Sequence, residues 1–296
     1  MLIPAGALID PVVLKQEIEY LSLPPARVGI DRNCFIIEER DREEERALGL
    51  RERLSSTLCG VGSALSRRVL RGDDARLAKD VVDEHPWLGK YLTHVSDEVS
   101  EGVDHGRKVL IEGTQGFGLS LYHSPHYPRT TSRDTTAAGF LSELGVSPRL
   151  VTEIVVVLRT FPIRVAGNQA GPLKDEITWD RLRVESGYPH PIEERTSVTN
   201  RIRRVARFDW EVARACAAIN RPTRIALNGL DYLDHKNFGL KKMEQLSQRA
   251  WSFMGRVEQE CEAPVEFIGV GPALTDIIVP NRGSKLSMVH ALESVS

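Results

Sequence analysis

The order of predicted secondary structure constrains the fold of this chain more than any other feature of its sequence. Runs of β-branched and other apolar residues, typical of buried strands, alternate with stretches of helical apolar spacing. The strongest strand signal is "TEIVVVLRTFPIRV" at 152–165, and the longest helical pattern is "LKKMEQLSQRAWSFMGRVEQECE" at 240–262. Strands that alternate with helices predict an α/β fold with a mostly parallel central sheet flanked by helices.

Further elements fit the same alternation. Asp10, followed by proline, is predicted to cap a helix, and Asp209 stands near the start of another at 208–220. The patterns "KVLIEG" at 108–113, "RIALNGLDYLD" at 224–234 and "PVEFIGV" at 264–270 predict strands, the first of them buried. No repeat or linker interrupts the 296 residues, so a single domain over 1–296 is predicted.

Composition excludes several classes of partner. The chain is 41% hydrophobic and 27% charged with a formal net charge of −2, so no global field attracts nucleic acid or an anionic membrane. No apolar run approaches the ~18 residues of a membrane span. The four cysteines lie far apart, which argues against a structural zinc site and a disulfide framework and indicates a reduced, cytoplasmic setting.

A glycine-rich stretch follows one predicted strand. In "VLIEGTQGFGLSL" at 109–121, glycines stand at 113, 116 and 118. This spacing matches neither the dinucleotide fingerprint nor the P-loop pattern GxxxxGK[ST]. Spacing alone favours a strand-end turn, and an anion-binding loop is the alternative. In a parallel sheet this loop, the loop after Val165, Asp231 and Gly269–Gly271 would all follow strands and could converge on one crevice.

Two further stretches carry hydroxyl groups that could bind phosphate. In "SSTLCGVGSALSRRVLRG" at 55–72, Ser56 and Thr57 could hold a phosphate with Arg71 as charge partner. The segment "PRTTSRDTT" at 128–136 clusters hydroxyls around an arginine and an aspartate. A capped helix explains either stretch about as well. The charged stretch "RDREEERALGLRERL" at 40–54 is predicted to be a solvated helix face.

Arginine is concentrated in "ERTSVTNRIRRVARFDW" at 194–210. Arg201, Arg203, Arg204 and Arg207 lie within seven residues, which indicates an acidic small molecule or a phosphate as ligand; a solvated arginine face is the alternative. Aromatic residues are nearly absent among them, so a nucleic-acid patch is disfavoured. Asp231 in "LNGLDYLD" could accept the two N–H donors on the edge of a guanine ring, a pairing that adenine does not offer.

Taken in order over nearly the whole chain, these stretches resemble the adenylosuccinate synthetase family, in particular its shorter, archaeal-type branch. The resemblance implies that family's P-loop-NTPase-like fold and a magnesium-dependent, homodimeric, cytoplasmic ligase of purine biosynthesis. Such an enzyme uses GTP to phosphorylate the 6-oxygen of inosine monophosphate (IMP). L-Aspartate then displaces that phosphate to give adenylosuccinate. Phosphorylation turns a poor leaving group into a good one, and charge must be neutralised throughout.

The resemblance also implies roles for individual residues. Thr57 and Thr131 would bind the 5′-phosphate of the nucleotide substrate, and Arg71 would reach that phosphate across a dimer interface. Gln115, the implied catalytic residue of this chain, would lie against the purine near the transferred group. The remaining implied contacts are Val165 with the ribose, Thr199 and Arg201 with aspartate, Arg203 with the transferred phosphates, and Asp231 and Gly271 with the guanine of GTP.

The sequence departs from the family pattern at its start. Family members open with a strand and a "GDEGKGK" loop that carries the catalytic aspartate, a phosphate-binding lysine and magnesium contacts, and neither occurs here. The fold is therefore expected to be N-terminally incomplete as written, with a misplaced start codon or a truncated gene as the cause. The Mg²⁺ ligands are expected in that absent segment and none in this chain.

Smaller departures concern the substrate. Cys59 replaces an arginine of many bacterial members, Ile202 and Arg207 interrupt the arginine-rich motif, and Gly229 stands where many members have a lysine. These traits are similar to the phage branch, whose enzymes join aspartate to deoxyguanosine monophosphate (dGMP) on the route to 2-aminoadenine DNA, some with ATP. A phage-type dGMP ligase is the first alternative to the IMP ligase. A non-catalytic nucleotide-binding remnant or dimerisation partner is the second.

Overall fold

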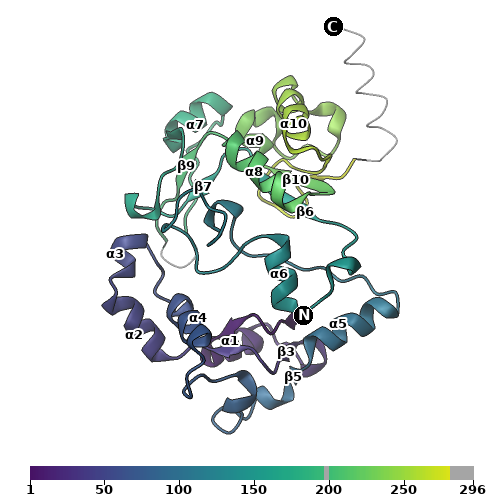
Figure 1. The fold of residues 1–296 in the computed structure, drawn as a ribbon. Helices are drawn as coiled ribbons and strands as arrows, with labels where there is room; N and C mark the ends of the chain where they lie inside the picture. Colours follow the sequence, from purple (N-terminus) through teal and green to yellow (C-terminus); the bar gives the residue numbers. More distant parts are fainter. Residues whose placement is uncertain (197–199, 281–296) are drawn as a thin grey trace. The chain divides into compact units, whose positions relative to one another are not determined.

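The computed structural model describes residues 1–196 and 200–280 (Figure 1). The chain divides into two compact units. Unit 1 consists of Met1–Val151 and Gln169–Gly171, and unit 2 of Thr152–Asn168 and the described residues from Pro172 onwards. Two such units can belong to one domain, so the single domain over 1–296 stays a prediction.

Unit 1 contains two small parallel sheets. One has the order β1-β3-β5 and the other pairs β2 with β4. The strands are β1 (Leu2–Ile3), β2 (Leu8–Ile9), β3 (Gly29–Asp31), β4 (Phe35–Ile36) and β5 (Leu92–Thr93). The helices are α1 (Pro11–Tyr20), α2 (Glu39–Ala47), α3 (Leu50–Leu54), α4 (Val61–Leu70), α5 (Val95–Asp104) and α6 (Ala137–Leu144). Asp10 caps α1 as predicted, because its carboxylate accepts hydrogen bonds from the Val12 and Val13 amides.

Unit 2 is built around a four-stranded sheet of order β12-β11-β10-β6. Its strands are β6 (Val155–Arg159), β10 (Arg224–Asn228), β11 (Val265–Gly269) and β12 (Ile277–Ile278); all pair in parallel except β12. An antiparallel sheet of order β7-β9-β8 consists of β7 (Ile163–Arg164), β8 (Glu176–Ile177) and β9 (Arg204–Ala206). The helices are α7 (Trp179–Ser186), α8 (Trp210–Asn220), α9 (Leu230–Leu233) and α10 (Gln248–Cys261).

Short 3₁₀ turns connect these elements. They are η1 (Pro25–Arg27), η2 (Ala78–Val81), η3 (Leu88–Lys90), η4 (Phe117–Leu119), η5 (Pro148–Leu150), η6 (Asn168–Ala170), η7 (His235–Asn237) and η8 (Met243–Gln245).

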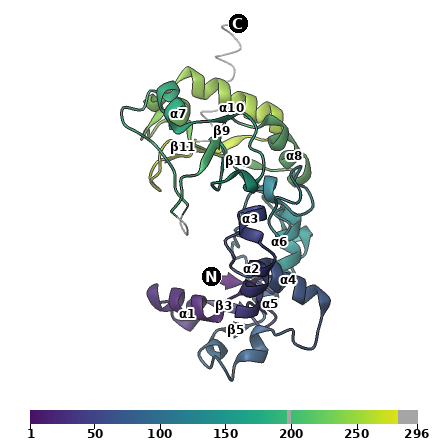
Figure 2. The same ribbon diagram turned by 90° about the vertical axis from the view of Figure 1, so that its left-hand side faces the viewer.

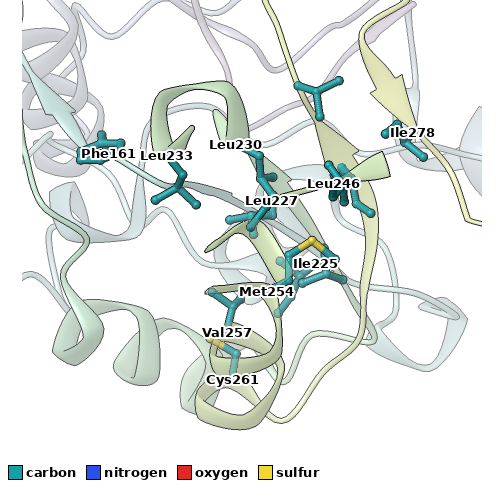
Figure 3. Packing of buried hydrophobic residues seen from close by; sticks show 14 of the residues in the cluster. Phe161, Ile225, Leu227, Leu230, Leu233, Leu246, Met254, Val257, Cys261 and Ile278 are labelled. Carbon is teal, nitrogen blue, oxygen red and sulfur yellow. The ribbon is translucent and has the colours of Figure 1, made fainter. Parts of the chain in front are cut away.

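The main core of unit 2 lies between its four-stranded sheet and α10, which runs along the sheet (Figure 2). Ile225 and Leu227 of β10 and Val257 of α10 are completely buried, and Met254 of α10 lies beside them (Figure 3). Each such side chain contributes roughly 1.5–3 kcal/mol through burial. This core fixes β10 and β11, and therefore the loops that follow them.

The α/β prediction with mostly parallel strand pairing is confirmed, and individual elements differ. The predicted buried strand at 108–113 is wrong: the segment has no strand structure, and Leu110 is 89% exposed. Among the described residues no strand pairs with it, and an apolar run without a ladder partner does not form a strand. The strand predicted at 224–234 ends at Asn228, and the helix predicted at 240–262 begins only at Gln248.

The strongest predicted strand forms β6, but at the edge of its sheet. Val155 and Val157 point to one face and are 41% and 63% exposed. Within residues 1–196 and 200–280, no helix is long and apolar enough to cross a membrane.

Candidate functional site

The first part of the candidate site is the loop between α3 and α4 in unit 1. Ser55, Leu58 and Gly60 have positive φ angles of 57°, 57° and 81°. A residue other than glycine in this region costs of order 1 kcal/mol or more, so surrounding contacts must hold the loop in place. Thr57, predicted to bind the 5′-phosphate, lies between these residues with its side chain exposed.

The second part is the hydroxyl-rich segment 128–136. The Thr131 amide donates to the Leu119 carbonyl at 2.8 Å, and the Leu121 amide donates to the Arg133 carbonyl at 2.9 Å. Asp134 accepts hydrogen bonds from the hydroxyls of Ser120 and Thr136. Burial alone would raise the pKa of Asp134, but these hydrogen bonds outweigh it and hold that pKa below its usual value.

The glycine-rich loop that contains Gln115 is tied to the same segment. Thr135 Oγ1 donates to the Gly116 carbonyl at 3.2 Å. Gln115 has a positive φ of 67° and an exposed side chain. The loop around Thr57 is also near, because a Cβ on Gly62 would lie only 3.9 Å from the Cβ of Ser132. Unit 1 therefore brings together the loops of Thr57, Gln115 and Thr131.

Arg71 lies away from this group. It caps the C-terminus of α4, whereas the Thr57 loop precedes the N-terminus of the same helix. Ten helical residues span about 15 Å. Within one chain the structure therefore does not bring Arg71 to the loop of Thr57.

In unit 2, Arg201, which is predicted to bind the substrate aspartate, lies in a segment that is hydrogen-bonded to the segment 194–196. The Thr196 amide donates to the Arg201 carbonyl at 2.9 Å, and the Arg203 amide donates to the Glu194 carbonyl at 2.7 Å. Thr199 lies outside the described residues. In the antiparallel register of β7 with β9, Arg164 is opposite Arg204, so Val165 and Arg203 come next along the pair.

The arginine cluster of 201–207 is not a single basic surface. Arg204 pairs with Glu176 of β8, with Nε at 2.9 Å from Oε1, and Arg207 donates to Glu185 at 2.7 Å. These two arginines therefore already have carboxylate partners, which neighbouring elements supply and which one sequence does not reveal. In the described part of the chain, Arg201 and Arg203 have no carboxylate partner.

The predicted base-reading residues follow adjacent parallel strands, as the sheet rule predicts. Asp231 is the second residue of α9, which starts shortly after β10, and Gly271 follows β11. A Cβ on Gly271 would come within 2.6 Å of Asp276 Oδ2, so a side chain there would require Asp276 to shift. Lys241 Nζ closes this loop by donating to the Thr275 carbonyl at 2.7 Å and to Asp276 at 3.1 Å.

Asp231 is buried, with 4% of its surface exposed, and its Oδ2 accepts a hydrogen bond from the Tyr188 hydroxyl. Burial raises the pKa of Asp231, and the Tyr188 hydrogen bond opposes that rise. Burial and the neighbouring Asp231 also raise the pKa of Tyr188, which keeps its hydroxyl protonated and able to donate. Sequence reasoning missed Tyr188, because nothing in "SGYPHP" indicates a partner 43 residues away.

The described residues do not fit a metal centre. Residues 1–196 and 200–280 contain no group of three or more His, Cys, Asp or Glu side chains that could hold a metal ion. No step of the reaction is therefore assigned to magnesium.

A hollow of about 520 Å³ in unit 1 is lined by residues that include Arg27, Lys90 and Arg107. Thr57, Gln115 and Thr131 are not among its lining residues, so it is separate from the candidate site.

Comparison with known proteins places this geometry in a family. A family model described as adenylosuccinate synthetase matches residues 72–240. The adenylosuccinate synthetase of Thermococcus onnurineus (strain NA1) is 40% identical over 281 residues, which cover 94% of this chain and 78% of that protein. The enzyme of Pyrococcus horikoshii is 41% identical over 285 residues, with the same coverage.

Two solved structures share the fold. Succinoaminodeoxyadenylate synthetase of cyanophage S-2L, bound to dGMP and to dATP as an energy donor, is 28% identical with a TM-score of 0.74; the match covers 98% of this chain and 79% of that one. Adenylosuccinate synthetase from Plasmodium falciparum, at 18% identity, has a TM-score of 0.81 over 95% of this chain and 84% of that one, and shows the fold alone. With its archaeal relatives near 40% identity, the chain belongs to the adenylosuccinate synthetase family, whose members are ligases that form a C–N bond.

Proposed function

We propose that this protein joins L-aspartate to IMP at the expense of GTP, producing adenylosuccinate for AMP biosynthesis. The observation that carries the proposal is the convergence, in unit 1, of three loops rich in hydroxyl groups and glycine around Thr57, Gln115 and Thr131. Its relatives at about 40% identity are named adenylosuccinate synthetases, which supports IMP as the substrate.

The nucleotide substrate is bound mainly by hydroxyl groups and backbone amides. Thr57 and Thr131 hold the 5′-phosphate, because hydroxyls and free N–H groups are suited to a phosphate monoester. Gln115 contacts the purine near its 6-oxygen with a side-chain amide that both donates and accepts hydrogen bonds. Val165 packs against the ribose. The exposure of Thr57 and Gln115 supports this assignment, because both side chains are available to a ligand.

The acidic groups of the reaction meet arginines that have no carboxylate partner within residues 1–196 and 200–280. Aspartate brings two carboxylates, held by Arg201 together with Thr199, and Arg203 neutralises the phosphoryl group in transit. An arginine already paired with glutamate, such as Arg204 or Arg207, is much less suited to this role. Fixed positive charge at the place where negative charge develops lowers the barrier to both transfer steps.

GTP is recognised through its base by Asp231 and Gly271. A carboxylate accepts both the N1–H and the 2-amino donors of guanine, whereas adenine presents no such donor pair. ATP is the alternative energy donor, because the phage synthetase was solved with dATP. Mg²⁺ would shield the charge of the transferred phosphates when bound, and no described residue is assigned to hold it.

A homodimer accounts for the position of Arg71. Its neighbours Val69 and Leu70 are 66% and 76% exposed, as expected of aliphatic side chains covered by a second subunit. Arg71 then serves the 5′-phosphate site of the partner subunit.

We place the enzyme in the cytoplasm, because all four cysteines are free thiols, three of them buried. Burial raises the pKa of Cys34 to about 12, so that thiol is unreactive.

A second candidate function is the ligation of aspartate to dGMP. The structural likeness to the phage synthetase at 28% identity favours it over any other alternative substrate. The higher identity to the archaeal enzymes makes IMP the first choice.

The test is product formation from each nucleotide. The protein is expressed from its gene with all in-frame coding sequence upstream of Met1, and products are separated by chromatography after incubation with aspartate, Mg²⁺ and each pairing of IMP or dGMP with GTP or ATP. Adenylosuccinate from IMP and GTP is expected. Product from dGMP but not from IMP would establish the second function. Nucleotide binding without product would identify a non-catalytic binding protein.

A further inference from the structure

Glu45 of α2 is buried beneath the loop of residues 55–60, which contains Thr57, the residue proposed to bind the 5′-phosphate. Only 3% of its surface is exposed, although its neighbour Glu44 on the same charged helix faces solvent. Its two carboxylate oxygens accept separate backbone hydrogen bonds, Oε2 from the Gly60 amide and Oε1 from the Gly62 amide, both at 2.9 Å. The prediction that 40–54 is a solvated helix face is therefore wrong at Glu45. A carboxylate is buried in this way only where hydrogen bonds replace its water.

These two amides belong to the start of α4. The first N–H groups of a helix have no partner within it and form the positive end of the helix dipole, which is a common place for a phosphate to bind. Here the carboxylate of Glu45 already occupies the Gly60 and Gly62 amides. These two amides are therefore taken, whereas the preceding loop offers the exposed hydroxyl of Thr57 to a phosphate bound near α4.

The same contact holds the loop in an unfavourable conformation. Gly60 ends a six-residue loop in which Ser55, Leu58 and Gly60 itself have positive φ angles. The loop lies tightly against α2, because a Cβ on Gly60 would approach the Cβ of Asp41 to 3.1 Å. Asp41, which is 1% exposed, also bonds to Arg67 of α4, with Oδ1 at 3.0 Å from Nε. Asp41 thus joins the two helices, and Glu45 joins α2 to the loop.

We propose that Glu45 is a positioning residue for the nucleotide 5′-phosphate. It occupies the Gly60 and Gly62 amides, fixes the Ser55–Gly60 loop and so directs the phosphate monoester to Thr57. The ligand class is a purine nucleoside monophosphate, distinguished from the nucleoside by its phosphate. The inference rests on the proposed function, which assigns Thr57 to that phosphate.

The first test uses isothermal titration calorimetry to compare the affinities of IMP and inosine for the protein. The protein is again expressed with the in-frame sequence upstream of Met1. Glu45→Gln replaces one carboxylate oxygen with an amino group that faces a backbone N–H, so one hydrogen bond is lost. We expect IMP affinity to fall about tenfold, the equivalent of one hydrogen bond to a charged group, and inosine affinity to stay unchanged. Glu44→Gln, on the exposed face of the same helix, is the matched control and should leave both affinities unchanged.

The possible results distinguish the positioning role of Glu45 from the phosphate site at Thr57. If Glu45→Gln keeps the wild-type preference for IMP over inosine, or weakens both ligands equally, the positioning role is overturned while the phosphate site stands. If the wild-type protein itself does not prefer IMP over inosine, the assignment of Thr57 fails and the inference fails with it.

A second measurement uses the wild-type protein and so does not depend on how the variant folds. Amide hydrogen exchange by NMR should show the Gly60 and Gly62 amides already protected without nucleotide, with no further protection when IMP is added. If these amides exchange rapidly in the free protein and become protected only with IMP, the phosphate rather than Glu45 occupies them, and the inference is wrong.

Discussion

The hydroxyl of Tyr188 donates a hydrogen bond to Oδ2 of Asp231 in the interior of unit 2, where only 7% of Tyr188 and 4% of Asp231 are exposed. The tyrosine ring lies against His235, with ring centroids 4.3 Å apart. The pair gives a buried carboxylate a fixed orientation by holding its Oδ2. We therefore expect stability and the proposed base recognition to be coupled at Asp231.

Tyr188→Phe should lower the free energy of unfolding by about 1–3 kcal/mol near neutral pH, because a buried carboxylate loses its hydrogen-bond donor. Burial raises the pKa of Asp231 above its unfolded value, so the contribution of this group to stability is fully present below the unfolded pKa and is lost as pH rises through the folded pKa. Without the tyrosine donor the folded pKa rises further. Urea unfolding of wild type and variant across pH 4–8 should show their difference growing as pH increases. A difference independent of pH would mean that the hydroxyl does not stabilise the ionised form.

Asp231→Asn should reduce the preference for GTP over ATP. An amide offers one acceptor oxygen and places a donor against the guanine N–H groups, so the discrimination of about 1–3 kcal/mol expected of a paired contact is largely lost. The measurement is kcat/KM for each nucleoside triphosphate. Asp234→Asn is a control, because Asp234 caps η7 three residues further along the chain. Unchanged discrimination in Asp231→Asn would remove Asp231 from base recognition.

Arg201→Ala should raise the KM for aspartate by tenfold or more, because a charged hydrogen bond to a substrate carboxylate contributes roughly 1.5–3 kcal/mol. Arg207→Ala is the matched control in the same segment. Its guanidinium is bonded to Glu185, so its removal should cost about 1 kcal/mol of stability or less and leave the aspartate KM unchanged. Equal effects of the two substitutions on KM would contradict the division of the arginine cluster.

Arg71→Ala and Gln115→Ala should each abolish most activity, and a mixture of the two inactive proteins should regain part of it. Arg71 lies at the opposite end of the ten-residue α4 from the Thr57 loop, so it is assigned to the site of the partner subunit. A mixed dimer would then contain one site with both wild-type residues. Activity assays after subunit exchange measure this gain, and its absence in dimers shown to exchange would place Arg71 outside the site.

The sequence predicted elements whose signals are local, and missed contacts that depend on distant partners. Asp10 was predicted as a helix cap and is one, and the helix predicted to start near Asp209 is capped by that residue. A capping bond reaches only two or three residues along the chain, so its signal is local. The apolar run around Leu110 looks like a strand, but strand formation requires a partner. Glu45 and Tyr188 could not be identified from the sequence, since their partners lie 15 to 43 residues away.

The candidate site shows the same division. The stretches around Thr57, Gln115 and Thr131 could be chosen because hydroxyls and glycines follow one another, and the structure brings these loops together. The sequence does not show which arginines of 201–207 are paired, because the carboxylates of Glu176 and Glu185 come from other elements. Each of those ion pairs depends on tertiary placement that composition does not encode.

The most direct test of the central claim is the formation of adenylosuccinate from IMP, aspartate and GTP by the protein expressed with its upstream in-frame sequence. We expect product that requires all three substrates, is lost in Gln115→Ala and Arg201→Ala, and forms faster from IMP than from dGMP. Product from dGMP but not from IMP, or turnover that is unaffected by both substitutions, would contradict this claim.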